Sequence, residues 1–244
     1  MEIIVSKDNE KNYLRNIGEE GQKHAYHKPF SDEKCGAYLM DIGSIISLLP
    51  PPPCKILDLG VGSGWTSVFF AQRGYQVIGQ DISDDFLDLA NKNKTRYQIK
   101  TLEFMACDYE ELPFIDEFDC ALFYDSLHHS TNAEKAINAV YRSLKSGGLF
   151  ISIEPGIGHS KSAESNKAKE MYGVTEKDMP PVLITKLGKK AGFRKVKIYL
   201  RQNNHPIEII PHLSIRGFIN ACKIFVRFLP VMGHLKSNIT TMIK

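Results

Sequence analysis

The residues best suited to chemistry lie in an apolar run that ends in glycines. Residues 56–66 read Ile-Leu-Asp-Leu-Gly-Val-Gly-Ser-Gly-Trp-Thr, with Gly60, Gly62 and Gly64 at alternate positions and Asp58 before them. A strand that ends in a glycine turn and leads into a helix lets the backbone approach a nucleotide-like ligand and directs amide donors at it. The sequence therefore predicts a cofactor of this kind and says less about a substrate.

Polar residues also follow each of the next three predicted strands. Asp81 ends the second strand, Cys107 and Asp108 end the third, and residues 124–129, Tyr-Asp-Ser-Leu-His-His, end the fourth and follow it. Ligands of an open parallel sheet bind beyond the carboxyl ends of its strands. One acid at a strand end is common in α/β proteins, but polar residues at consecutive strand ends predict one shared site.

The elements that must position these residues alternate between apolar strands and helices. We expect strands over residues 55–59, 76–80, 101–106, 118–124, 149–153 and 195–200. We expect helices over residues 32–49, 66–73, 84–94, 132–144 and 182–191. Ser83 is suited to cap the start of the helix over 84–94, and residues 145–148 carry a signal for the end of the helix before them. Apolar strands separated by helices are typical of a parallel sheet covered on both faces, so the fold class is α/β.

Composition shifts divide the chain into three parts. Residues 1–53 form a helical segment, predicted to act as a lid, that ends in four prolines. Residues 54–211 form the core, in which the polar stretch 156–180 is an insertion near the site and 207–210 suggests a further strand. Residues 212–244 form a basic amphipathic tail.

The tail has two interpretations. From residue 201 to the end there are six Lys or Arg against one Asp or Glu, and apolar residues recur at helical spacing from 215 to 229. Such a helix either packs on the core or on a partner subunit, or lies on an anionic membrane surface. The oligomeric state is not predicted.

Composition excludes several classes of protein. The 244 residues are 43% hydrophobic and 24% charged with a net charge of +3, which is ordinary for a globular protein and gives no strong field for nucleic acid. The five cysteines show no C-x-x-C pair, so we predict reduced thiols, no metal site and a cytoplasmic location, with any peripheral membrane contact made by the tail. Neither a signal peptide nor a membrane span is expected, because the N-terminus turns polar early and every long apolar run contains charges.

The motifs together resemble those of class I S-adenosylmethionine-dependent methyltransferases of the small-molecule type. The resemblance covers residues 54–154, more weakly to about 201, and includes the runs 108–114 and 143–149. It implies a Rossmann-like, mostly parallel seven-stranded sheet with an antiparallel strand near the end, and S-adenosyl-L-methionine as the cofactor. The N-P-P-Y-type signature of amino-directed base and protein methylation is absent after the fourth strand, which argues against a nucleic-acid partner.

The resemblance also implies roles for individual residues. The acid at 58 would order the ammonium group of the methionine moiety, Asp81 would take the ribose hydroxyls, and Asp108 would take the adenine amino group. The cofactor-binding residues implied in this way are Asp58, Gly60, Gly62, Gly64, Asp81, Ile82, Cys107, Asp108, Tyr109 and Tyr124.

His128 and His129 are the candidate catalytic residues. They follow the fourth strand, beside the expected position of the methyl group, where a histidine could deprotonate an acceptor near neutral pH. The alternative is that one of them caps a helix or packs in the core, and Asp125 is a third candidate base. Glu154 could line the acceptor pocket, whereas His159 is interpreted as a loop residue.

The predicted activity is methyl transfer to a small-molecule acceptor, which includes sugar-like, glycan or lipid-linked compounds, at oxygen. One alternative is a catalytically silent subunit that binds the cofactor. Another is an NAD-dependent dehydrogenase, whose G-x-G-x-x-G motif would need glycine where Trp65 stands, although Asp81 fits both classes.

Overall fold

A seven-stranded sheet lies at the centre of the computed structural model, which describes residues 2–201 and 237–244. Its strand order is β3-β2-β1-β4-β5-β7-β6. The strands are β1 (Lys55–Leu59), β2 (Gln76–Asp81), β3 (Leu102–Ala106), β4 (Phe118–Tyr124), β5 (Leu144–Ile153), β6 (Arg194–Tyr199) and β7 (Ile239–Ile243). The first five pair in parallel, and β7 runs antiparallel to both of its neighbours. The α/β class and the antiparallel strand near the end are therefore confirmed.

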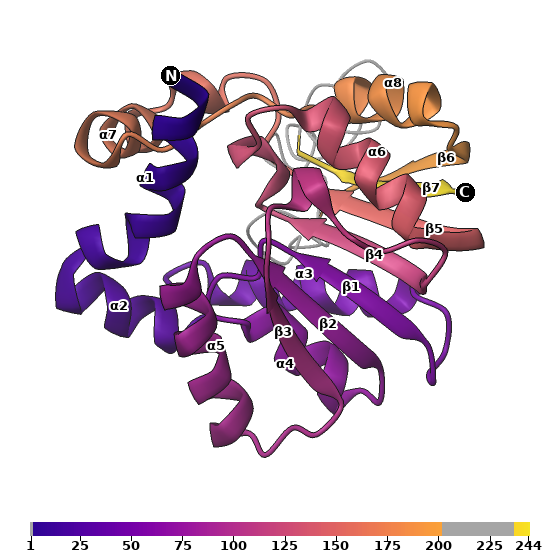
Figure 1. Cartoon of the computed structure of the whole chain (residues 1–244), viewed down its shortest axis with the longest axis horizontal. Helices are drawn as coiled ribbons and strands as arrows, with labels where there is room; N and C mark the ends of the chain where they lie inside the picture. Colours follow the sequence, from indigo (N-terminus) through magenta and orange to yellow (C-terminus); the bar gives the residue numbers. More distant parts are fainter. Residues whose placement is uncertain (1, 202–236) are drawn as a thin grey trace, which may run out of the picture.

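Helices cover both faces of this sheet (Figure 1). They are α1 (Glu2–Asn16), α2 (Gly18–Tyr26), α3 (Cys35–Leu48), α4 (Trp65–Gln72), α5 (Asp84–Arg96), α6 (Ala133–Ser143), α7 (Ala163–Tyr172) and α8 (Pro181–Ala191). Helices α6 and α8 pack together on one face, whereas α4 and α5 contact β2 and β3 on the other. Short 3₁₀ turns occur at Tyr109–Glu111, Leu127–His129 and His159–Lys161.

The central strands are buried on both sides, which explains their continuous apolar sequences. Ile56 of β1 packs into the cluster that contains Ile45 of α3 and Val68 of α4. The next residue, Leu57, packs into the opposite cluster with Ile137 of α6. Successive side chains of a strand point to opposite faces, so an uninterrupted apolar run is needed where both faces are covered.

Two predicted boundaries are wrong, both around β5 and β7. Residues 145–148 do not end a helix: α6 stops at Ser143, and the glycines 147 and 148 lie inside β5, which starts five residues earlier than predicted. Residues 212–244 are not wholly a tail, because β7 inserts between β5 and β6 and completes the sheet. The early start of β5 has a physical cause: the Gly147 amide donates to the Lys244 carbonyl and the Gly148 carbonyl accepts from the Lys244 amide, so the end of the chain after β7 holds these glycines.

The segment from 156 to 180 is more regular than its polar sequence suggests. It contains α7, which lies beside α1 in Figure 1 and contacts it. The predicted strand near 207–210 and the predicted amphipathic helix over 215–229 fall outside the described residues. None of the helices in the described ranges has both the length and the apolar character that crossing a membrane requires.

Candidate cofactor and acceptor site

A cavity of about 600 Å³ lies at the carboxyl ends of the parallel strands. Its wall is formed by the glycine turn after β1, the residues after β2, β3 and β4, helices α1 and α2, and the segment 172–176. Its volume is within the range of small-molecule sites, which is about 300–1,000 Å³. Most of the strand-end residues predicted from the sequence therefore share one site with the two flanking segments.

The glycine turn needs Gly60 because two loops meet there. Gly60 has a φ of +68°, and a Cβ at this position would lie 2.5 Å from Cβ of Ser126 in the loop after β4. The Ser126 hydroxyl donates to the Leu59 carbonyl at 2.7 Å and holds the two loops together. A side chain at residue 60 would push the loops apart.

Asp81 is held at the cavity by two backbone donors. The amide of Gly62 donates to Oδ2 at 2.8 Å, and the amide of Ser83 donates to Oδ1 at 2.9 Å. The carboxyl group is buried, which raises its pKa above the usual range although these hydrogen bonds oppose the shift. Both Asp81 and the adjacent Ile82 line the cavity.

Three predicted cofactor residues do not line the cavity. Asp58 is fully buried behind the turn, where Oδ2 accepts hydrogen bonds from the hydroxyls of Thr66 and Ser67 at 2.7 Å each, and burial raises its pKa to about 6. Gly64 packs against Phe104 of β3, and Cys107 also lies outside the wall. Their predicted contacts with the cofactor stay predictions.

Asp108 and Tyr109 do line the cavity, where they meet a residue that the sequence did not single out. The ammonium group of Lys7, from α1, pairs with the Asp108 carboxylate and lies 2.9 Å from that of Glu110. These ion pairs fasten α1 over the end of β3. No local sequence signal could have identified Lys7, because only the tertiary structure brings α1 to this strand.

Tyr124 is fixed by a buried network at the end of β4. Its hydroxyl donates to Oδ2 of Asp41 at 2.7 Å, and Arg201 donates to the same carboxylate at 2.7 Å. Burial and the nearby carboxylates of Asp125 and Asp41 raise the pKa of Tyr124 well above its usual value. The tyrosine therefore stays neutral and joins α3, β4 and the segment after β6 at the cavity wall.

The histidine loop is shaped by Glu154 at the end of β5. The Glu154 carboxylate accepts hydrogen bonds from the amides of Ser126, Leu127 and His128, and lies 2.8 Å from Nδ1 of His128. Burial lowers the pKa of His128, but the hydrogen bond and charge of Glu154 outweigh it, so the pKa is raised. His128 is buried and is not part of the cavity wall.

His129 is the predicted catalytic histidine that faces the cavity. Its Nδ1 lies 2.6 Å from the carbonyl of Thr175, and burial together with the neighbouring His128 holds its pKa well below the usual value. Glu10 of α1 and Glu176 also line this end of the cavity. Sequence reasoning missed both glutamates, since neither is close to the strand ends along the chain.

The lining residues suit S-adenosyl-L-methionine. Asp81 and Asp108 offer acceptors for hydroxyl and amino groups, and Ile82 and Phe86 offer apolar surface for a purine ring. Carboxylates exceed ammonium and guanidinium groups along the wall, which favours a ligand that carries a sulfonium and an ammonium group. The turn also lacks a Cβ at Gly60, where one would have to displace the loop after β4.

Comparison with known proteins points in the same direction. Residues 57–152 match the family described as "Methyltransferase domain". An uncharacterized methyltransferase of Bacillus subtilis, YcgJ, is 28% identical over 127 residues, which is 51% of this chain and 50% of that protein. The ubiquinone/menaquinone biosynthesis C-methyltransferase UbiE of Haemophilus ducreyi is 31% identical over 105 residues, 41% of this chain and 40% of that protein. The chain thus spans about half the length of the curated relatives it matches, or less.

Solved structures share the fold. The crystal structure of YcgJ aligns with a TM-score of 0.62 at 19% identity and covers 83% of this chain and 97% of that one. Phosphoethanolamine N-methyltransferase 2 of Haemonchus contortus, solved with S-adenosyl-L-methionine, aligns with a TM-score of 0.61 at 19% identity and covers 84% of this chain and 52% of that one.

Proposed function

Because the chain belongs to the class I S-adenosylmethionine-dependent methyltransferases, we propose that it transfers the methyl group of S-adenosyl-L-methionine to a small-molecule acceptor. One observation carries the proposal: a single cavity joins the carboxylates of Asp81 and Asp108 to the group of His129, Glu10 and Glu176. The first pair suits the nucleoside of the cofactor. The second group suits an acceptor that must lose a proton.

The protein contributes mainly by holding the reactants in place. The cofactor, when bound, supplies an electrophilic methyl group on a positively charged sulfur. Asp81, fixed by two backbone amides, accepts from vicinal hydroxyls, and Asp108 accepts from an amino group. Orientation of an acceptor atom toward the methyl carbon then supplies much of the rate enhancement.

We assign oxygen as the methylated atom, in a small or sugar-like acceptor. A hydroxyl group must lose its proton as it attacks, and the acceptor end of the cavity is rich in groups that accept protons. Lys7, at the other end, is already paired with Asp108 and Glu110, so it does not offset these carboxylates. A neutral hydroxyl compound therefore suits this end better than an anionic one.

A second candidate is methylation at carbon. The UbiE relatives are named C-methyltransferases, and a deprotonated phenol is nucleophilic at oxygen and at ring carbons alike. The same acceptor end would serve both reactions, because both begin with loss of the hydroxyl proton. The position of the methyl group in the product distinguishes them.

The first test is calorimetric titration of the chain with S-adenosylhomocysteine. Binding with one site per chain is expected, and no detectable binding at millimolar ligand would refute the proposal. The second test incubates the chain with S-adenosyl-L-methionine and a panel of phenols, catechols and sugars. Mass spectrometry detects methylation, and NMR of the product separates O-methyl from C-methyl. Tight cofactor binding without any methylated product would favour a silent partner subunit.

A further inference from the structure

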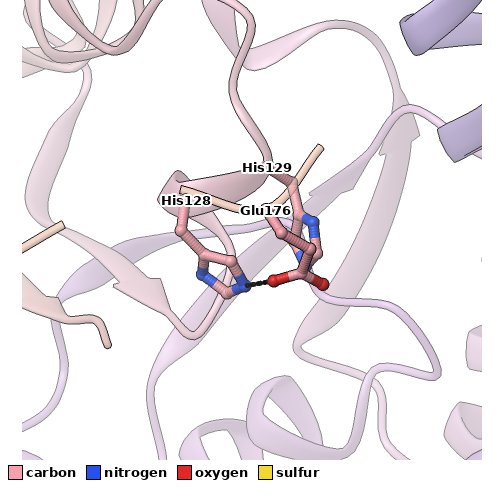
Figure 2. Close-up of side chains that lie close together, drawn as sticks. All are labelled: His128, His129 and Glu176. Atoms are coloured by element: carbon pink, nitrogen blue, oxygen red, sulfur yellow. Dashed lines mark ion pairs between the residues drawn. The ribbon is translucent and has the colours of Figure 1, made fainter. Parts of the chain in front are cut away.

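Two histidines and a glutamate converge at the acceptor end of the cavity. His128 and His129 come from the turn after β4, and Glu176 comes from the segment between α7 and α8 (Figure 2). Each offers one ligand atom, and the three atoms lie within 4.8 Å of one another. Two imidazoles and one carboxylate form a common ligand set for divalent transition metals in proteins.

One nitrogen of each ring already has a partner outside the three proposed ligands. Nδ1 of His128 lies 2.8 Å from Oε2 of Glu154, and Nδ1 of His129 lies 2.6 Å from the Thr175 carbonyl. Carboxylate and carbonyl oxygens accept, so Nδ1 carries the hydrogen in each ring, and Nε2 is the nitrogen that a metal ion would bind in place of a proton. Histidines that bind metal are oriented in this way by a partner on their other nitrogen.

The spacing of the ligand atoms also fits a shared ion. Nε2 of His128 lies 3.7 Å from Oε2 of Glu176, which is too long for a hydrogen bond. Metal–ligand distances of about 2.0–2.2 Å and a tetrahedral angle would place two ligand atoms about 3.4 Å apart. The observed separation is thus close to that of two ligands of one ion.

The negative charges around His128 and His129 favour a bound cation. Glu10 and Glu154 flank the histidines in addition to Glu176, and Glu154 is 1% exposed. Among the described residues, the ion pairs of these three carboxylates involve histidines and neither Lys nor Arg. Buried carboxylates need a compensating positive charge, which protonated histidines or a bound divalent ion can supply.

We propose that His128, His129 and Glu176 bind one divalent transition-metal ion of the zinc class. Three protein ligands leave a coordination position open, and His129 and Glu176 are part of the cavity wall, so this position faces the cavity. An oxygen of the acceptor could bind there, and the ion would make a hydroxyl more acidic. That last consequence rests on the proposed methyl transfer, whereas metal binding itself does not.

The sequence could not predict this site. It predicts no metal site, because its cysteines lack metal-ligand spacing and His128 and His129 stand next to each other. The third ligand comes from a distant segment, which is joined to the loop after β4 by hydrogen bonds from Lys177 to the Ser130 and Thr131 carbonyls. The set therefore exists only in the folded chain.

The experiment uses the full chain, stripped of metal with a chelator and then titrated with Co²⁺. We expect one Co²⁺ per chain, visible absorption bands in the range of four- or five-coordinate cobalt, and displacement by Zn²⁺. His129→Ala and Glu176→Gln should weaken Co²⁺ binding more than Glu154→Gln does. Glu154 is a hydrogen-bond partner of a ligand and not a ligand itself, so its loss should lower the metal affinity about 10–100-fold. His27→Ala is the matched control, since His27 is exposed and stands outside both the cluster and the cavity wall, and it should bind as wild type does.

Circular dichroism and titration with S-adenosylhomocysteine identify any variant that has lost its fold. Should His129→Ala fail to fold, Glu176→Gln and Glu154→Gln, which preserve side-chain size, decide the question. Absence of stoichiometric binding by wild type at micromolar Co²⁺ or Zn²⁺ would overturn the metal site. So would equal binding by wild type and Glu176→Gln, because the metal would then sit on other histidines. Failure of S-adenosylhomocysteine to bind would count against the methyl-transfer proposal alone.

Discussion

The two ends of the cavity are built in different ways. The cofactor end consists of strand ends and the turns that follow them, where backbone amides of Gly62 and Ser83 hold Asp81. The acceptor end is assembled from side chains of α1, of the loop after β4 and of the segment before α8. The first arrangement is fixed by the sheet itself. The second depends on contacts between segments far apart in the chain, so it can change while the fold persists.

The largest effect expected at the cofactor end is that of Gly60→Ala. An L-residue at a φ of +68° costs about 1–2 kcal/mol, and overlap with Ser126 adds about 1–3 kcal/mol, so we expect a loss of about 2–5 kcal/mol in stability. Binding of S-adenosylhomocysteine should be lost with it. Urea unfolding and calorimetry measure the two effects.

Gly147→Ala is the control for that substitution. Gly147 also has a positive φ, +78°, but a Cβ there would meet nothing within 4 Å. We expect a loss of about 1–2 kcal/mol from the backbone alone, with cofactor binding retained. If both variants unfolded at the same urea concentration and bound S-adenosylhomocysteine equally, the close approach of the two loops at residue 60 would contribute neither to stability nor to cofactor binding.

Asp58 gives the next largest effect, as a dependence of stability on pH. Its pKa is about 6 in the folded chain against an ordinary value of 3.8, so the folded state favours the protonated form. Wild type should therefore lose stability as the pH rises from about 4 to 6, by about 3 kcal/mol in total. In Asp58→Asn this contribution is absent, so the variant should gain about 3 kcal/mol relative to wild type between pH 4 and pH 7.

Urea unfolding of both proteins at pH 4 and pH 7 tests this. A constant difference in stability caused by the new amide group does not affect the result, because only the change between the two pH values is compared. An equal slope in variant and wild type would mean that Asp58 is ionised without penalty. Calorimetry on the same samples shows whether this acid, which is separated from the cavity, affects the cofactor at all.

Asp81→Ala should weaken S-adenosylhomocysteine binding by about 10–150-fold, because it removes a charged acceptor worth about 1.5–3 kcal/mol. Asp88→Ala, an exposed position on α5, is the matched control and should bind as wild type does. Glu176→Gln should also retain its affinity within about threefold, since it belongs to the other end. Equal weakening by Asp81→Ala and Glu176→Gln would show that the ends are not separate.

The same division explains what the sequence could predict. Strand β1 and strand β4 have the predicted bounds, and Ser83 does cap α5, because apolar periodicity and local capping decide these features. Gly60, Asp81 and Asp108 were located for the same reason. Lys7, Glu10 and Glu176 were not, since their role arises from packing between α1 and distant segments. The residues of β7 were not predicted as a strand, because its position depends on pairing with β5 and β6 and not on a local sequence pattern.

The smallest effect on overall stability, and the sharpest test of the comparison, is expected from Glu10→Ala. Oε1 of Glu10 accepts from the amide of Thr175 at 2.8 Å, and the Ser6 and Thr175 hydroxyls lie 2.5 Å apart, so polar contacts join α1 to the segment 156–180 in addition to the packing of Tyr13 against Tyr172. Loss of one such bond should cost about 1 kcal/mol locally. Hydrogen exchange of the amides in α1 and near residue 175 should then be about fivefold faster, while the sheet changes little.

Glu19→Ala is the control: it also removes a glutamate side chain, but at an exposed position of α2 that does not contact Thr175. It should leave the exchange of these amides unchanged. If Glu10→Ala instead accelerated exchange in β1, β4 and β5 as much as in α1, the acceptor end would unfold only together with the sheet. The distinction between an end fixed by the fold and an end held by side chains would then fail. Acceleration confined to α1 and the neighbourhood of residue 175 would mean that the acceptor end can open and close over a cofactor end that stays in place.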